Sequence, residues 1–273
     1  MEMTPLAVRA LSGLFEQMTG QQLADGRRWR IDVALQAVMR ARDIGGLDAL
    51  AAQVAHPGAT ELRATVVEAL LNHETFFYRD MAAFRTLVDE GLPHLAERRG
   101  AARRLRIWSA GCSTGQEPYS IAFALAAAET RWRGWTIEIV GTDVSPVAIG
   151  KARAGVYSQF EVQRGLPVRD LITRFDPEGE AWRVRPAALE GVSFAVHNLL
   201  DPPPAGEFDV ILCRNVLLYF SAARRRDVFD RLTTAIARDG VLMLGAGETV
   251  LGQTDAFRTD PALRGLYRPA TAP

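Results

Sequence analysis

Two kinds of hydrophobic spacing divide the chain. Over residues 5–88, apolar residues recur every three or four positions, as Leu11, Leu14 and Phe15 do. This is the period of an amphipathic helix, and no segment of this region alternates as a strand would. The spacing therefore predicts a small helical N-terminal domain over residues 1–90.

From residue 91 onward, the apolar residues come in short continuous runs that are separated by helical patterns. The runs that predict strands are Leu105–Ser109, Ile137–Gly141, Val192–Val196, Phe208–Cys213 and Val241–Leu244. Helical patterns over Tyr119–Glu129 and Ala222–Ala237 lie between some of them. Strands that alternate with helices are typical of an α/β domain with a mostly parallel, doubly wound sheet. We expect this domain over residues 91–273, with the Arg-rich stretch that ends at Arg106 as a linker.

Residues 156–190 interrupt this alternation. They contain Pro167, a polar turn at residues 176–180, and the segment 182–185, whose side chains alternate as in an edge strand. The pattern predicts a small antiparallel β-subdomain inserted into the α/β domain.

Composition narrows the functional class. The 32 basic and 32 acidic residues balance, so the charge gives no indication of nucleic acid as a partner. Cys112 and Cys213 are too few for a disulfide framework or a four-cysteine zinc site, and we interpret them as structural. No apolar run approaches the roughly 20 residues that span a bilayer, and the N-terminus lacks a signal-peptide pattern. We expect a cytoplasmic protein with no metal site and no membrane insertion.

The turn after the first predicted strand could hold a ligand. Residues 109–117 are mostly small, which lets the backbone approach a ligand closely. A helix that begins near Pro118 would direct free N–H groups at that ligand. The glycine spacing is not G-x-G-x-x-G, so a dinucleotide is disfavoured. Taken alone, a plain strand-to-helix turn is an equally good interpretation.

The end of the second predicted strand carries Asp143. A carboxylate at this point of an α/β sheet can accept hydrogen bonds from both hydroxyls of a ribose. The alternative is that Asp143 caps the helix starting at Pro146, although Ser145 could fill that role by itself.

Polar residues also follow two further predicted strands. Asn198 could contact the edge of an adenine ring, and Arg214 and Asn215 come directly after an apolar strand. Polar groups at such positions need partners, which a ligand can supply. Asn215 as a helix cap and Tyr219 as a core residue are the alternatives.

At this point the residues resemble a known family, the chemotaxis receptor methyltransferases (CheR type). Five segments carry the resemblance, in the order of the family: residues 74–80, 106–120, 141–145, 151–157 and 208–220. Together they extend the match over roughly residues 10–268. The resemblance implies a class I methyltransferase domain that uses S-adenosyl-L-methionine. Its acceptors would be glutamate side chains of a methyl-accepting receptor or related signalling protein. Separately, we expect the protein to be a monomer.

The resemblance also implies roles for individual residues. The implied cofactor-binding set is His73, Thr75, Arg79, Glu117, Asp143, Asn198, Leu199, Arg214 and Asn215. Thr75 and Arg79 would reach the methionyl portion, and Glu117 would bind its ammonium group. Asp143 would bind the ribose, and Asn198 with Leu199 the adenine side. Arg79 and Tyr219 would be catalytic, with Arg214 and Asn215 lining the methyl-transfer end beside Tyr219.

Two departures from the family pattern leave alternatives open. The family usually has Asn where this chain has His73, and Asn72 stands beside it, so either residue could take that role. The second N-terminal helix of the family is often densely basic, whereas residues 31–42 are weakly basic here. The same fold and cofactor with a different acceptor, or a non-catalytic scaffold that binds adenosylmethionine, are the alternative functions.

Overall fold

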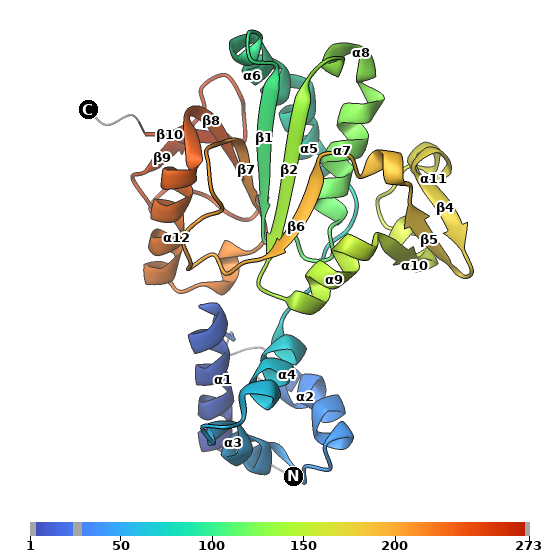
Figure 1. Cartoon of the computed structure of the whole chain (residues 1–273). Helices are drawn as coiled ribbons and strands as arrows, with labels where there is room; N and C mark the ends of the chain where they lie inside the picture. The colour runs from blue at the N-terminus through green and yellow to red at the C-terminus, as the bar shows by residue number, and fades with distance from the viewer. Residues whose placement is uncertain (1–3, 24–28, 271–273) are drawn as a thin grey trace. The chain divides into compact units, whose positions relative to one another are not determined.

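The computed structural model describes residues 4–23 and 29–270, which group into two compact units. The first unit contains the described residues up to Asn72 together with Tyr219–Arg224. The second contains His73–Leu218 and the described chain from Arg225 onward. Figure 1 shows the elements of each unit.

The described N-terminal residues form helices, as the sequence predicts. Their bounds are α1 Pro5–Thr19, α2 Trp29–Ala41, α3 Leu47–Ala55 and α4 Thr60–Leu70. The Thr4 hydroxyl caps α1 by accepting a hydrogen bond from the backbone N–H of Ala7. One apolar side chain from each helix, Leu11, Leu35, Leu50 and Val66, is fully buried in a shared core. Burial of these apolar faces, rather than helix propensity alone, stabilises the unit.

The second unit is an α/β domain. Its helices are α5 Met81–Arg85, the π-helix η2 Thr86–Gly91, α6 Leu92–Arg99, α7 Gln116–Ala127, α8 Glu129–Trp132, α9 Pro146–Ala154, α10 Gln159–Gln163, α11 Val168–Arg174, η3 Pro186–Ala188, η4 Leu217–Tyr219 and α12 Ala222–Ala235. Its strands are β1 Arg104–Ala110, β2 Thr136–Asp143, β3 Val156–Ser158, β4 Phe175–Glu178, β5 Ala181–Val184, β6 Val192–Val196, β7 Phe208–Cys213, β8 Ile236–Leu244, β9 Phe257–Thr259 and β10 Leu266–Pro269. The first residues of α12 and the last of η4 group with the first unit.

The main sheet has the strand order β6-β2-β1-β7-β8-β10-β9 in the described chain. All neighbouring strands from β6 to β8 are parallel, and β10 pairs antiparallel with both β8 and β9. Every residue of β7 is buried, as expected for a central strand with helices on both faces. The carboxyl ends of β1, β2, β6, β7 and β8 therefore meet at one edge of the sheet.

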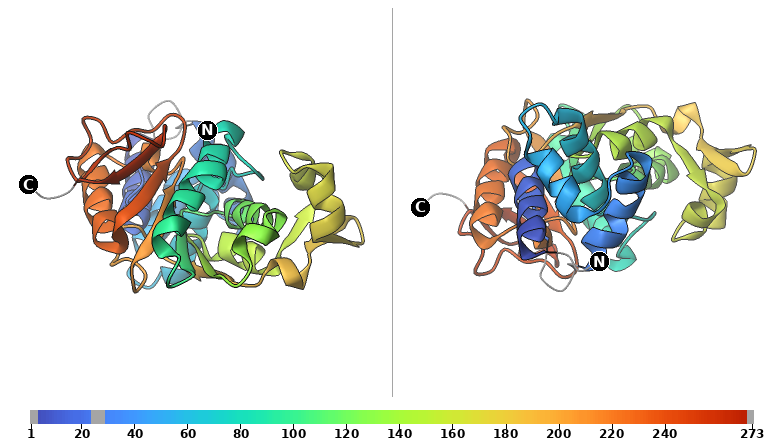
Figure 2. Two further views of the ribbon diagram at one scale, coloured as in Figure 1. Left: turned by 90° about the horizontal axis from the view of Figure 1, so that it is seen from above. Right: turned by 90° about the horizontal axis from the view of Figure 1, so that it is seen from below.

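Helices cover both faces of this sheet. Helix α7 connects β1 to β2, and α9 follows β2 and contacts β2 and β6. Helix α12 leads from β7 to β8, in the opposite direction across the sheet. Right-handed crossovers therefore place α12 on the other face, and Figure 2 shows the helices on the two sides of the strands.

The structure groups residues 73–90 with the sheet, although the sequence pattern put them in the helical domain. Phe77 explains why, because its fully buried ring lies among Tyr157 and Phe175, with centroids 5.1 and 5.8 Å away. Phe84 and Leu87 belong to the same core. The helical period of this segment is real, but its apolar face packs against the α/β unit.

The Arg-rich stretch before β1 is not a linker. Its first half is helix α6, and the Arg99 guanidinium donates to the carboxylates of Asp209 and Asp239 at 2.5–2.9 Å. The second carboxylate oxygen of Asp209 accepts a hydrogen bond from the backbone N–H of Arg106 at 2.8 Å. These contacts fix the end of α6 to the amino end of β7, an arrangement that hydrophobic patterning could not reveal.

Residues 156–184 form a three-stranded antiparallel sheet with the order β3-β5-β4. The sequence pattern had predicted residues 182–185 as an edge strand, but β5 is the central strand of this sheet. The segment still alternates because one face of the sheet, with Tyr157, Phe175 and Val184, is buried in the core, whereas Arg183 lies on the exposed face. The Ser158 hydroxyl and the Glu161 carboxylate form a capping box at the start of α10.

We predict that Arg99→Ala lowers the free energy of unfolding by about 1–3 kcal/mol at pH 7, because it removes the ion-pair partner of the largely buried Asp209 carboxylate. Urea denaturation would measure the change. Arg98→Ala is the matched control, since that side chain is half exposed and lies 3.8 Å from Asp239. It should change stability by no more than about 0.5 kcal/mol.

Arg99 also holds the pKa of the Asp239 carboxyl below its usual range. This part of the stabilisation is present above an unfolded pKa of about 3.9 and is lost as pH falls through the lowered folded pKa, so the difference between wild type and variant should shrink in acid. An undiminished difference in acid, or equal losses in both variants, would contradict the assignment.

Candidate functional site

The turn after β1 is bound to the end of β2. The backbone N–H groups of Gly111 and Cys112 both donate to the Thr142 carbonyl at 2.8 Å. The N–H of Ser113 donates to the Asp143 carboxylate, also at 2.8 Å. These bonds hold two strand ends at the carboxyl edge of the sheet in one fixed arrangement.

Gly115 is required where this turn enters α7. Its φ of 94° lies in the left-handed region, and a Cβ there would stand 2.8 Å from the Cβ of Ala152. The absence of a side chain thus permits close packing of the turn against α9. Helix α7 begins at the next residue, so Glu117 lies in its first turn, directly beside the carboxyl edge of the sheet.

A buried ion-pair network occupies the ends of β1 and β7. The Arg214 side chain is 2% exposed and donates to Glu117 at 2.8 Å and to Asp80 at 2.9 Å. The other oxygen of Glu117 accepts a hydrogen bond from the Ser109 hydroxyl at 2.7 Å. Arg214 also donates to the backbone carbonyl of Arg79 at 2.8 Å. The network therefore joins three of the predicted residues, Arg79, Glu117 and Arg214.

The turn that carries Arg79 has an unusual backbone. Tyr78 and Asp80 have φ values of 54° and 56°, in the left-handed region that residues other than glycine rarely adopt. The Tyr78 N–H donates to the Ser120 hydroxyl, and its own hydroxyl bonds Asp170. The side chain of Arg79 donates to the Glu74 carbonyl at 3.0 Å. Such strain persists only where surrounding contacts fix the backbone, as Arg214 and Ser120 do here.

The contacts of Asp143 decide against its alternative role as a helix cap. The Ser145 hydroxyl caps α9 by accepting from the Ala148 N–H at 2.9 Å, as the sequence allowed. Asp143 instead accepts hydrogen bonds from the backbone N–H groups of Ser113 and Ser145. The Ser113 hydroxyl donates in turn to the His73 carbonyl at 2.9 Å. Asp143 and His73 are thus linked through one turn, and the ribose role of Asp143 stays a prediction.

The remaining predicted residues lie in separate places. Asn198 follows β6, and its side-chain oxygen accepts from the Leu200 N–H at 3.0 Å, while Leu199 is buried. Thr75 is partly buried in the irregular segment before Tyr78. Their cofactor roles stay predictions.

The sequence reasoning missed Glu248, which organises the loop after β7. Its carboxylate accepts hydrogen bonds from the backbone N–H groups of Asn215, Gly245 and Leu218 at 2.7, 2.9 and 3.2 Å. Asn215 needs this support because its φ is 58°. The sequence does contain a feature that could have identified Glu248, because it closely follows the buried strand β8 just as Arg214 follows β7.

Two polar atoms at this edge are buried without a protein partner. Within the described part of the chain, the Nε of Arg214 and the Oδ1 of Asn215 have no hydrogen bond. Buried polar groups are normally satisfied, so both atoms have the capacity to bind a ligand or water.

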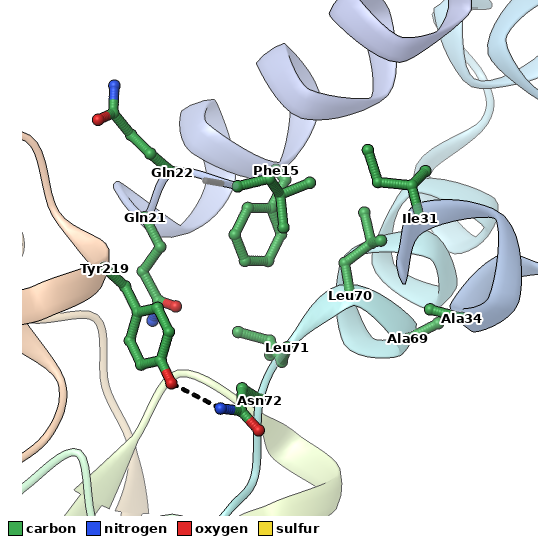
Figure 3. Close-up of a pocket in the computed structure, with 11 residues that line it drawn as sticks. Phe15, Gln21, Gln22, Ile31, Ala34, Ala69, Leu70, Leu71, Asn72 and Tyr219 are labelled. Carbon is green, nitrogen blue, oxygen red and sulfur yellow. Dashed lines mark hydrogen bonds between the residues drawn. The ribbon is translucent and has the colours of Figure 1, made fainter. Parts of the chain in front are cut away.

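The Tyr219 ring groups with the N-terminal helices. Its hydroxyl lies 2.5 Å from the side-chain nitrogen of Asn72, as Figure 3 shows. The sequence analysis left open whether His73 or Asn72 takes the role of the family's Asn. In the structure, the side chain of Asn72 contacts Tyr219.

The cysteines are buried, at 2% and 0% exposure for Cys112 and Cys213. Burial raises the pKa of each thiol well above its ordinary value, so neither is an activated nucleophile. Among the described residues, no group of three or more His, Cys, Asp or Glu side chains is arranged to hold a metal ion. No described helix is both long and apolar enough to span a bilayer.

The chain is similar to a family of known proteins. Residues 73–265 match the family described as CheR methyltransferase, SAM binding domain. The chemotaxis protein methyltransferase Cher2 of Pseudomonas putida is 35% identical, over 89% of this chain and 90% of the relative. Chemotaxis protein methyltransferase 1 of Pseudomonas aeruginosa is 36% identical over the same shares. The chemotaxis protein methyltransferase of Vibrio parahaemolyticus is 34% identical over 91% of each chain. With its parallel sheet, its strand-end carboxylates and this match, the chain belongs to the CheR family of S-adenosyl-L-methionine-dependent methyltransferases.

Proposed function

We propose that this enzyme transfers a methyl group from S-adenosyl-L-methionine to glutamate side chains of a chemoreceptor or related signalling protein. The products are glutamyl methyl esters and S-adenosylhomocysteine. The main support is similarity to chemotaxis protein methyltransferases over about nine tenths of both chains. The proposal includes action in the cytoplasm as a monomer.

The residues at the carboxyl edge of the sheet fit the cofactor. Glu117 has one hydrogen bond at each oxygen, which leaves lone pairs for an ammonium group. Asp143 at the end of β2 has the position from which a carboxylate can bind ribose hydroxyls. The glycine turn brings backbone close to both, and the unpartnered Nε of Arg214 offers a further donor. We assign His73, Thr75, Arg79, Asn198, Leu199 and Asn215 to the same ligand.

The bound cofactor supplies an activated methyl group on a sulfonium. A glutamate carboxylate has an unperturbed pKa of about 4.3 and is already ionised near neutral pH, so this acceptor needs no general base. The protein must instead align the carboxylate and exclude water, and alignment can contribute several kcal/mol. A hydroxyl donor such as Tyr219 can orient one carboxylate oxygen without the strong ion pair that would weaken the nucleophile.

The two ion pairs of Arg214 indicate which residue orients the acceptor. Arg214 is bonded to two carboxylates, Glu117 and Asp80, so its charge is already compensated within the protein. A group so engaged suits cofactor binding and preorganisation better than direct capture of an acceptor carboxylate. We therefore assign acceptor orientation to Tyr219 and assign Arg79 to the cofactor's methionyl end, near the transferred methyl.

A different acceptor is the second candidate function. The observation that favours it is helix α2, which has two basic residues, Arg30 near its start and Arg40 in its last turn, together with Asp32 in its first turn. A receptor surface that is strongly acidic would not be attracted to such a helix. A silent, cofactor-binding scaffold is less well supported, because the relatives are methyltransferases and because Arg79 and Tyr219, the residues proposed for catalysis, are present.

We predict that the protein transfers labelled methyl groups to a receptor-sized band in membranes from its own source. The label should be released by mild base, because carboxyl methyl esters hydrolyse readily whereas N-methyl groups do not. Heat-inactivated protein is the control. A base-stable label, or a labelled band only among soluble proteins, would favour the second candidate.

We predict that Asp143→Ala weakens binding of S-adenosylhomocysteine by about 1–3 kcal/mol, because ribose hydroxyls lose their acceptor. Calorimetry measures the affinity. Ser145→Ala removes the cap of α9 but not this carboxylate, and should leave affinity nearly unchanged. Equal affinity of wild type and a folded Asp143→Ala would show that Asp143 only holds the turn at Ser113.

We predict that Tyr219→Phe lowers the turnover number about 10-fold or more, which corresponds to one oriented hydrogen bond of about 1.4 kcal/mol in the transition state. The ring is kept, so affinity for S-adenosylhomocysteine should change little. Steady-state kinetics and calorimetry on the same preparation separate the two effects. Turnover at the wild-type rate would make Tyr219 a packing residue, and a joint loss of affinity would place it in the cofactor site.

A further inference from the structure

Asn72 and Tyr219 form a direct contact between side chains 147 positions apart in sequence. The Nδ2 of Asn72 donates to the Oη of Tyr219 at 2.5 Å. Figure 3 shows the phenol ring extending towards the amide, with the two polar ends meeting. Nothing in the spacing of the sequence indicates this pair.

The backbone on both sides of the pair is fixed. Leu71, at the end of α4, donates its N–H to the carbonyls of Val67 and Glu68, which places the next residue, Asn72. The Tyr219 carbonyl accepts from the Gln22 N–H at 2.6 Å. The pair is therefore held by backbone bonds and not only by its own contact.

The pair borders a cavity of about 60 Å³. Its apolar wall comes from the N-terminal helices, including Phe15, Ile31 and Leu70, while Asn72 and Tyr219 line one end (Figure 3). The volume exceeds the 10–15 Å³ or so that a water molecule needs. A small polar group can therefore approach this end of the cavity.

The polarity of the hydrogen bond determines what the phenol can do. A phenolic oxygen both accepts and donates, whereas a carboxamide nitrogen only donates. Because the amide nitrogen is the donor, the hydroxyl hydrogen is not used in this bond. Asn72 thereby favours the rotamer in which Tyr219 donates in another direction, and an ionised carboxylate is an acceptor only.

We propose that Asn72 is a positioning residue for methyl transfer, whose amide directs the hydroxyl hydrogen of Tyr219 to the acceptor carboxylate. This inference rests on the proposed role of Tyr219 and adds the residue that sets its hydrogen-bond polarity. The amide does not touch the reacting atoms and acts only through the phenol.

The decisive variant is Asn72→Asp, which keeps the size of the side chain and replaces the donor by an acceptor. The carboxylate would take the hydroxyl hydrogen for itself, so the turnover number should fall about 10-fold or more, as in Tyr219→Phe. Binding of S-adenosylhomocysteine, measured by calorimetry, should stay within about 2-fold of wild type. Asn72→Ala removes the donor without adding charge and should give a smaller loss.

Gln21→Glu is the matched control. It makes the same amide-to-acid change in the same cavity, where no described hydrogen bond joins the Gln21 side chain to Tyr219. Its turnover should stay within about 2-fold of wild type, so a comparable loss would show that any negative charge in the cavity is harmful and would overturn the inference.

The double variant Asn72→Asp/Tyr219→Phe gives the readout that a structural role would not change. If Asn72 acts through the hydroxyl, the double variant should be as slow as Tyr219→Phe and no slower. A further loss would overturn the inference, as would wild-type turnover in Asn72→Asp. Should Asn72→Asp fail to fold by circular dichroism, Asn72→Ala with its own double variant carries the same test. Wild-type turnover in Tyr219→Phe would instead refute the proposed role of Tyr219, which separates the two failures.

Discussion

The burial of one positive charge constrains the whole carboxyl edge of the sheet. Arg214 follows the central strand β7, and its side chain is 2% exposed. An unpaired charge in such a place would cost several kcal/mol, so partners must be brought to it. Glu117 from α7, Asp80 and the carbonyl of Arg79 all converge on the guanidinium. Three segments that are distant in sequence are thus fixed together before any ligand binds, which is the preorganisation that methyl transfer requires.

Much of this arrangement could be predicted because it depends on short-range patterns. The bounds of β6 and β7 agree with the predicted runs. Every residue of β7 is buried, and a strand buried on both faces must be apolar along its whole length. The alternation of strands and helices predicts a parallel sheet, and a parallel sheet brings strand ends to one edge. Arg214 was therefore identified as a site candidate from its place after an apolar strand, and the family resemblance added Glu117; neither inference used their contact with each other.

The features that could not be predicted depend on contacts between residues that are far apart in the sequence. The helical period of residues 81–91 says that one face is buried, but not which unit buries it. Asp80 contacts Arg214 only because the turn before α5 adopts a left-handed backbone. Glu248 closely follows a buried strand, so its position could have marked it as a candidate. Its role is to accept hydrogen bonds from three backbone N–H groups, which no sequence pattern predicts. The Asn72–Tyr219 pair is of the same kind.

The two cysteines give the carboxyl edge a built-in chemical reporter. Cys112 belongs to the turn after β1 and Cys213 is the last residue of β7, so both thiols sit beneath the loops that form the site. Because a thiol reacts as its thiolate, and burial disfavours that form, alkylating reagents can modify either residue only when this edge opens. The rate of alkylation therefore measures the free energy of local opening without any introduced label. For the same reason, a fluorophore attached through a newly introduced surface cysteine would report on the helical unit without background from the native thiols.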